Sequence, residues 1–332
     1  MLHRKLVRSL AVKSVLLLGM LALPGLAPAW AQKGFPDRTV TLVVPSQPGG
    51  SIDFLARLLS EPLSKSMGVP VVVENKPGAS GNIGNMQVAR ARPDGYTLLL
   101  AYNGFLVGNP HLYKTGTVDP VKELAPVSMV AQAPQIIVAT NGLPANDIQT
   151  LIQYARQHPG KLNYASSGYG SVPHLAGELL RQRMGVDIAH IPYKGAGGAV
   201  VDLIAGQVDL YITSPAGVMQ QIESGQIKAL AVTGKERLAA LPNVPTAAEA
   251  GLQDYEMGSW FAVYAPAGTA PAVVDRLNAE IRQALENPQI RQRALAGGMA
   301  LEYSTPPQLA AFTAQQVDYW RDIVHTAGLK AQ

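Results

Sequence analysis

The sequence predicts an α/β fold, and three observations support it. Short β-branched runs alternate with stretches whose apolar residues recur at helical spacing, as in β–loop–α units around a mainly parallel sheet. The 332 residues are enough for about two domains of roughly 150 residues each. Hydrophobic residues make up 47% and charged residues 15% of the chain, which excludes a disordered chain and leaves ample material for a core.

The first 31 residues have the three-part pattern of a secretory signal peptide. A basic start without acidic residues is followed by an apolar run from Ser14 to Leu26 and by Ala29-Trp30-Ala31, a small-x-small cleavage pattern. A membrane anchor is the alternative, but a spanning helix needs about 20 apolar residues, and Pro24 and Pro28 interrupt this run. We therefore expect cleavage after Ala31 and a mature protein in the periplasm.

Composition excludes several classes of function. Removing residues 1–31 takes away four of the 27 basic residues and none of the 23 acidic ones, so the mature chain has a formal charge of zero. The pI near 9.2 therefore belongs mostly to the leader, and no nucleic-acid partner is expected. The absence of cysteine excludes disulfides, thiolate metal sites, cysteine nucleophiles and lipid attachment through an N-terminal cysteine.

The expected elements follow one another in two series. Val40–Val44 is a compact β-branched run, and the apolar residues of Ile52–Met67 recur at helical spacing. The other expected strands are 69–73, 96–101, 136–139, 162–165, 188–191, 208–212 and 229–232. The other expected helices are 86–90, 148–157, 174–184, 199–205, 218–224, 271–295 and 306–326.

Three loops share one design: each follows a strand, is rich in glycine and small polar residues, and opens a helix. They are Pro45–Asp53, Asn75–Gly84 and Ser166–His174. Glycine lets a backbone approach a ligand closely, and helix N-termini offer N–H donors that favour anions. Each loop alone is explained equally well as a capped turn, with Ser51 or Ser171 as the cap. Three such loops at the carboxyl ends of strands favour a ligand site.

Signatures of catalysis are weak in the same loops. The phosphate-binding G-x-x-x-x-G-K-[ST] motif is absent, and Gly78 to Asn82 fails the G-x-S-x-G pattern at its last position. No two histidines stand at helical ligand spacing, so we expect no metal and no cofactor. An exported serine hydrolase that uses Ser167 with His174, or Ser80, remains the alternative.

Two later stretches add candidates. Pro192–Ala199 either is a plain loop that opens a helix or presents the ring of Tyr193 to a cleft. Lys194 either attracts an acidic ligand or is a solvated surface lysine. Tyr211–Pro215 ends a strand with hydroxyl groups that face the same cleft in this interpretation, Ser214 among them.

An ordered set of motifs resembles one family over essentially the whole mature chain. The set is Phe35-Pro36, Val43-Val44-Pro45, Pro48-Gly49-Gly50 with Asp53, Ala56-Arg57, Val73 to Gly84, Pro93 to Leu98, Pro192 to Gly195, Asp202-Leu203 with Gly206 to Asp209, and Leu241 to Thr246. With these motifs the chain resembles the Bug-type (TctC-like) extracytoplasmic solute receptors of the tripartite tricarboxylate transporter family. It departs from the family at Ser46, where an aromatic or larger apolar residue is common, and this leaves the ligand open.

The resemblance implies a two-lobed periplasmic-binding-protein fold of type II-like topology, with two α/β domains around a ligand cleft. Domain 1 would comprise residues 32–133 and 258–332, and domain 2 residues 134–257. The implied function is capture of a small carboxylate (dicarboxylate, amino acid, aromatic acid or tricarboxylate) by a monomeric receptor without catalysis. The implied partners are inner-membrane permease subunits, and a ligand sensor uncoupled from transport is the alternative. Backbone donors and bridging waters would hold the ligand carboxylate.

The residues expected to bind the ligand lie on the three loops and the two later stretches. They are Ser46, Pro48, Gly49, Gly50, Asp53, Gly78, Ala79, Ser80, Gly81, Asn82, Ser166, Ser167, Gly168, Ser171, His174, Tyr193 and Ser214.

The leader generates the first testable prediction. N-terminal sequencing of the exported protein should begin at Gln32, because the small residues Ala29 and Ala31 suit a signal peptidase. Recovery of the uncleaved chain from the membrane fraction would contradict this prediction.

Overall fold

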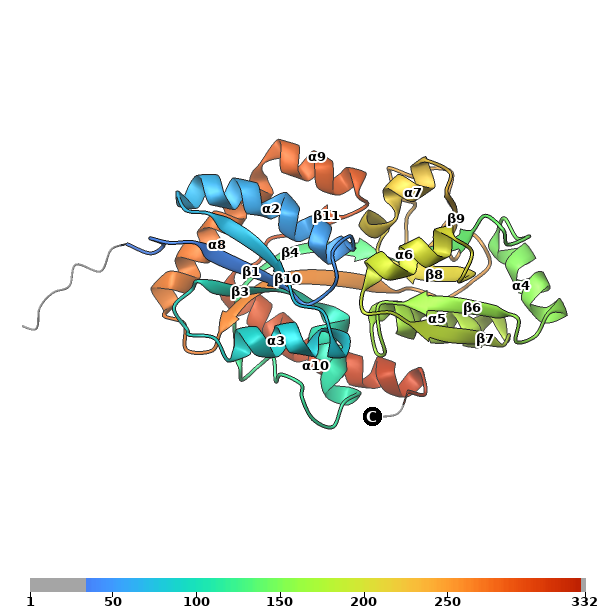
Figure 1. The fold of residues 1–332 in the computed structure, drawn as a ribbon, viewed down its shortest axis with the longest axis horizontal. Helices are drawn as coiled ribbons and strands as arrows, with labels where there is room; N and C mark the ends of the chain where they lie inside the picture. Colours follow the sequence, from blue (N-terminus) through green and yellow to red (C-terminus); the bar gives the residue numbers. More distant parts are fainter. Residues whose placement is uncertain (1–33, 330–332) are drawn as a thin grey trace, which may run out of the picture. The chain divides into compact units, whose positions relative to one another are not determined.

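The computed structural model describes residues 34–329, and it contains helices and two mixed sheets, which confirms the α/β prediction (Figure 1). The expected leader, residues 1–31, lies outside the described residues. Among the residues that are described, no helix combines the length and apolarity needed to cross a bilayer.

The first sheet has six strands in the order β11-β4-β10-β3-β1-β2. β1 pairs in parallel with β2 and β3, whereas β10 runs antiparallel to both β3 and β4. β11 adds a short antiparallel edge to β4. The strands are β1 (Val40–Val44), β2 (Val71–Asn75), β3 (Thr97–Tyr102), β4 (Leu124–Pro134), β10 (Gly258–Pro266) and β11 (Ala300–Leu301).

The second sheet has five strands in the order β7-β6-β8-β5-β9. β6 is parallel to β7 and β8, and β5 is antiparallel to β8 and β9. The strands are β5 (Ile136–Thr140), β6 (Leu162–Ser166), β7 (Ile188–Pro192), β8 (Leu210–Thr213) and β9 (Ile227–Val232). The expectation of a mainly parallel sheet is therefore wrong, because β10 in the first sheet and β5 in the second run antiparallel to their neighbours.

Helices flank both sheets, and we call each sheet with its helices a lobe. Lobe 1 has the six-stranded sheet with α2 (Ser51–Met67), α3 (Asn82–Ala89), α8 (Pro271–Glu286), α9 (Pro288–Ala296), α10 (Pro306–Thr326) and the short turns η1 (Ala79–Gly81), η2 (Gly104–Gly108) and η3 (Asn109–His111). Lobe 2 has the five-stranded sheet with α4 (Ile148–Gln157), α5 (Val172–Met184), α6 (Ala196–Ile204), η4 (Pro215–Gly217) and α7 (Met219–Glu223). Figure 1 shows α2 and α8 on lobe 1 and α4 to α7 around the second sheet.

One helix expected from the sequence is two. The stretch 271–295 was expected to be continuous, but α8 ends at Glu286 and α9 begins at Pro288. Asn287 between them accepts hydrogen bonds from the N–H groups of Gln289 and Ile290 and so caps the second helix. A proline fits the first turn of a helix but not its interior, so the chain breaks before Pro288.

The chain passes from lobe 1 to lobe 2 through Gln135, the single residue between β4 and β5. Gln135 is fully buried, and its backbone exchanges hydrogen bonds with Thr233, which follows β9. Its Nε2 donates to Ser259 Oγ (2.9 Å) on β10 and to Ser214 Oγ (3.3 Å) after β8. One side chain therefore links the crossing segments to both sheets.

The packing of α5 on β6 in lobe 2 generates a stability prediction. Gly177 lies on α5 against the ring of Tyr164, which is 1% exposed, and a Cβ at position 177 would overlap that ring. Gly177→Ala should lower the free energy of unfolding by about 1–3 kcal/mol through overpacking, although alanine favours helices. Urea unfolding measures the change, with Gly142→Ala as control because its Cβ would enter open space. Equal stability of the two variants would contradict the packing described.

Candidate functional site

A cavity lies between the lobes, and none of its lining side chains is acidic or basic. Both lobes contribute hydroxyl groups, and aromatic and small apolar side chains complete the wall. The lining residues are Ser46, Gly50, Ser51, Ile52, Tyr102, Phe105, Ser167, Pro173, Ala196, Thr213, Ser214 and Phe261. An ionised ligand at this place would meet hydrogen-bond donors rather than opposite charges.

Two helices, one from each lobe, place their first residue in the lining of this cavity. α2 starts after Gly50 and α6 starts after Gly195, and neither cap residue provides a side-chain hydrogen bond. The first N–H groups of a helix have no partner within it, and they carry a partial positive charge. Because Ser51 and Ala196, the first residues of the two helices, line the cavity, both helix N-termini contribute to a site suited to an anion.

The side of the cavity next to β10 is built around Ser51 and Ser214. Ser51 Oγ donates to the Ser214 carbonyl oxygen (3.0 Å) and accepts from the Gly217 N–H (3.1 Å). Ser214 Oγ lies 3.2 Å from Ser259 Oγ on β10. These contacts join the start of α2 in lobe 1 to η4 in lobe 2 and fix the hydroxyl group of Ser51.

An aromatic group forms the apolar wall. The rings of Tyr102 and Phe105 meet edge to face with centroids 5.1 Å apart, and Phe261 lies 5.8 Å from Tyr102. Burial raises the pKa of Tyr102 well above its ordinary value, so its phenol stays neutral. The phenol oxygen accepts a hydrogen bond from the Val172 N–H (3.1 Å) at the start of α5. Tyr102 therefore contributes to the cavity wall and contacts the other lobe.

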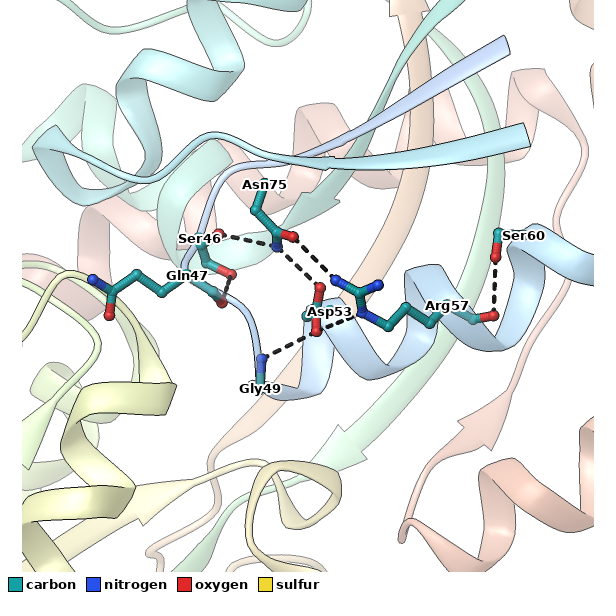
Figure 2. A network of polar contacts seen from close by, with 7 residues as sticks. All are labelled: Ser46, Gln47, Gly49, Asp53, Arg57, Ser60 and Asn75. Atoms are coloured by element: carbon teal, nitrogen blue, oxygen red, sulfur yellow. Dashed lines mark hydrogen bonds and ion pairs between the residues drawn. The ribbon is translucent and has the colours of Figure 1, made fainter. Parts of the chain in front are cut away.

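Hydrogen bonds to the Asp53 carboxylate hold the loop that carries Ser46 and Gly50 in place (Figure 2). The Gly49 N–H and Arg57 Nε each donate to Asp53 Oδ2 at 3.0 Å, and Asn75 Nδ2 donates to Oδ1 at 3.0 Å. The same Asn75 amide donates to the Ser46 carbonyl oxygen at 3.2 Å. One carboxylate on α2 thus fixes both ends of the loop and its link to β2.

The charge of Asp53 is retained inside the protein. Burial by itself would raise the pKa of the carboxyl, which is 4% exposed, but the hydrogen bonds from Arg57, Gly49 and Asn75 outweigh it and hold the pKa below its usual value. The carboxylate is therefore ionised and its oxygens face protein donors. Asp53 lies outside the cavity lining, and a direct ligand contact by Asp53 stays a prediction.

The second expected loop, residues 78–82, lies beside the cavity and not in its lining. Ser80 Oγ accepts a hydrogen bond from the Tyr113 phenol (2.9 Å), and Asn82 Oδ1 accepts one from Asn109 Nδ2 (2.8 Å). Gly168 of the third loop packs so near that a Cβ there would lie 2.8 Å from Ser80 Oγ. The second and third loops therefore touch each other across the lobes, while a ligand contact by residues 78–82 stays a prediction.

The third loop brings Ser167 and Pro173 into the lining, and Ser167 Oγ pairs there with the Tyr211 phenol at 2.8 Å. Ser166 is fully buried and bonds His190 Nε2 at 2.6 Å. Ser171 caps α5, as the alternative interpretation of this loop expected. The Gly170 N–H donates to His174 Nδ1 at 2.9 Å, so His174 supports the loop and is bonded to Gly170 rather than to Ser167.

His174 and His190 stack with ring centroids 3.8 Å apart. Burial, reinforced by repulsion from His190, lowers the pKa of His174 to about 3. Burial lowers the pKa of His190 to about 4, against an opposing effect of Glu178. Both rings are therefore neutral at pH 7, and His174 accepts the hydrogen bond that shapes the loop.

The two later stretches differ in position. Ser214 and Thr213 line the cavity, whereas Tyr193 donates its phenol proton to Asp202 Oδ2 (2.6 Å) in its own lobe. Lys194 is exposed and is not part of the lining. The expected residues that meet in the lining are thus Ser46, Gly50, Ser167 and Ser214.

Comparison with known proteins identifies the family. The model described as tripartite tricarboxylate transporter family receptor matches residues 55–329. The chain belongs to this receptor family. Its members are solute-binding receptors, and the chain is accordingly a Bug-type periplasmic solute-binding protein.

Solved structures of similar sequence have the same fold. The periplasmic binding protein BugD is 39% identical with a TM-score of 0.86, over 90% of this chain and all 100% of that chain. A protein of R. palustris solved with adipate is 36% identical with a TM-score of 0.87, over 90% of this chain and 100% of its own. MatC from Rhodopseudomonas palustris with bound malate is 33% identical with a TM-score of 0.82, over 87% and 100%. The two-domain fold implied by the sequence motifs is thereby confirmed.

Sequence reasoning missed most of the apolar lining. Tyr102 directly follows the expected strand 96–101 and ends β3, so its place at a carboxyl end is a usable signal. Phe261 lies on β10, which was not expected at all, and Phe105 lies in the irregular turn η2. Their place in the wall depends on contacts between distant parts of the chain.

The stacked histidines generate a pH prediction. Unfolded histidine has a pKa near 6.5, so between about pH 6.5 and 4 the unfolded chain binds protons that the folded chain does not. The free energy of unfolding should therefore fall as the pH drops through this window. His190→Gln should reduce the loss, because one titrating ring is removed.

Urea unfolding at pH 7 and pH 5 measures this slope, and His158→Gln, a change at an exposed histidine, is the control. A slope unaffected by His190→Gln would show that other groups dominate the acid response.

Proposed function

We propose that this receptor captures a small carboxylate in the cavity between its lobes and delivers it to inner-membrane permease subunits of a tripartite tricarboxylate-type transporter. The observation that carries the proposal is the uncharged lining at which α2 and α6 both begin. Helix N–H groups and serine hydroxyls donate to a carboxylate at hydrogen-bond distance, and hydrogen bonds to a charged group are stronger than neutral ones.

The apolar wall favours a ligand with a carbon chain. Tyr102, Phe105 and Phe261 offer aromatic surface, while the hydroxyl groups lie toward the N-termini of α2 and α6 and toward β10. Adipate and malate, present in two similar structures, are carboxylates joined by short carbon chains. We infer that Ser46, Gly50, Ser167 and Ser214 contact the ligand, and that Asp53 and His174 act by supporting their loops.

We place the proposed domain boundaries where the chain passes from one lobe to the other. Domain 1 would run to residue 133 and resume at 258, with Gln135 and Thr233 at the hinge. Export by the leader and cleavage after Ala31 would place the receptor beside the permease, outside the inner membrane.

The test is calorimetric titration of the mature protein, unfolded and refolded to remove co-purified ligand, with adipate, malate and other C4 to C9 carboxylates. We expect saturable binding of at least one, with the ligand recovered unchanged by NMR. Consumption of the ligand would indicate an enzyme, and failure of every carboxylate to bind would contradict the proposal.

Matched variants then locate the site. Ser167→Ala should weaken binding by about 1–3 kcal/mol, the usual cost of losing a hydrogen bond to a charged group. Lys76→Ala and Lys194→Ala should change it little, because Lys76 pairs with Glu74 at 2.8 Å and Lys194 is exposed. A large loss at either lysine would mean that an ion pair dominates binding.

A further inference from the structure

The lobes touch along one margin of the cavity, where residues 47–50 of lobe 1 meet residues 195–198 of lobe 2. A Cβ built on Gly197 would lie 2.5 Å from the Pro48 carbonyl oxygen. A Cβ built on Gly50 would lie 2.9 Å from Ala196 Cβ. Real Cβ atoms essentially never come within 3.0 Å of a heavy atom outside their own residue and its chain neighbours, so neither position accepts a side chain while the lobes are in contact.

Local backbone geometry does not account for these two glycines. Gly50 has φ −92° and ψ 173°, an extended conformation open to any residue. Gly197 lies inside α6, without the positive φ found at Gly49 and Gly195. Alanine at position 197 would raise the helix propensity. The feature that requires glycine at both positions is the contact with the opposite lobe.

The lobe 1 side of this contact is firmly held. Asp53 fixes the Gly49 N–H, and Asn75 fixes the Ser46 carbonyl oxygen, so residues 46–49 are tied to α2 and β2 (Figure 2). The atom that a methyl group at position 197 would strike is a backbone oxygen, which moves only with the loop. Accommodation therefore requires the lobes to separate.

We propose that Gly50 and Gly197 form a steric latch: their missing side chains let the lobes close over the cavity, and this closure sets how long a ligand stays bound. The latch as a device for ligand retention rests on the proposed function, whereas the steric contact between the lobes does not. Gly50 and Ala196 line the cavity as well, so the same contact closes its wall. A ligand enters and leaves while the latch is open, so a change at the latch acts on the closed state alone.

The test compares Gly197→Ala with Gly198→Ala, the next residue of α6. A Cβ at position 198 would be 3.3 Å from Tyr193 Cδ1, a tight contact within its own lobe, and 3.7 Å from Gln47 Oε1 of lobe 1, an ordinary van der Waals distance. Because the sequence has no cysteine, spin labels can be attached at Glu61→Cys on α2 and Val201→Cys on α6, both exposed. Double electron–electron resonance then reports the distance between the lobes, without ligand and with saturating adipate.

Gly197→Ala should shift the distribution toward longer distances in at least one condition, while Gly198→Ala should match the parent protein. The melting temperature of Gly197→Ala should not fall, which separates a blocked latch from a failure to fold. If a carboxylate binds, its dissociation rate should rise about tenfold or more in Gly197→Ala, with little change in the association rate.

A compensating pair provides the rescue. Gly50→Ala should open the lobes in the same way, and adding Ala196→Gly should restore the parent distances, because the next nearest atom to the new Cβ is 4.0 Å away. Parent-like distances for both Gly197→Ala and Gly50→Ala in both conditions would overturn the latch. Failure of every carboxylate in calorimetry would overturn the proposed function separately, since the distances without ligand test the contact by themselves.

Discussion

The buried carboxylate of Asp53 is the interaction on which the candidate site depends. A buried charge is costly unless it is paired and hydrogen-bonded, and here Arg57, Asn75 and the Gly49 N–H meet that requirement together. The result is a loop whose position is set by α2 and β2. The cavity wall at Ser46 and Gly50 and the proposed latch both follow from this position.

The same arrangement reconciles an acidic residue with a site for anions. Asp53 lies in the first turn of α2, where an uncompensated negative charge would repel a carboxylate. The hydrogen bonds and the ion pair from its partners compensate the negative charge of Asp53, and the N–H groups of Ser51 and Ile52 remain beside the cavity. The guanidinium of Arg57 is largely exposed and engaged with Asp53, so it is a structural cation rather than a ligand contact.

Local patterns predicted much of the fold. Val40–Val44, Ile148–Gln157 and Pro306–Thr326 have the predicted bounds, because β-branched runs, capping residues and apolar spacing are properties of adjacent residues. β4 and β10 were missed: they pair with each other across more than a hundred residues of chain, and no local signal shows that. The break at Asn287-Pro288 has a local signal, because a proline fits the first turn of a helix but not its interior.

Local patterns likewise predict one part of the candidate site, and the other part depends on contacts between distant segments. Ser46, Gly50, Ser167 and Ser214 follow or end strands, and the rule that ligands lie at the carboxyl ends of strands is enough to suggest them. Phe261 and Ala196 reach the cavity because one lobe is placed against the other. Which of Ser166 and Ser167 faces the cavity also depends on packing, since His190 draws the first into the interior.

The uncharged lining has a consequence for the surroundings in which such a receptor works. Attraction between exposed charges weakens as salt accumulates, since screening at physiological ionic strength acts over about 8 Å. Short hydrogen bonds inside a closed cavity are far less affected, because no ions lie between donor and acceptor. A receptor outside the inner membrane meets the salinity of its environment. One that recognises an acid through hydroxyl and N–H groups retains its affinity from dilute to saline water.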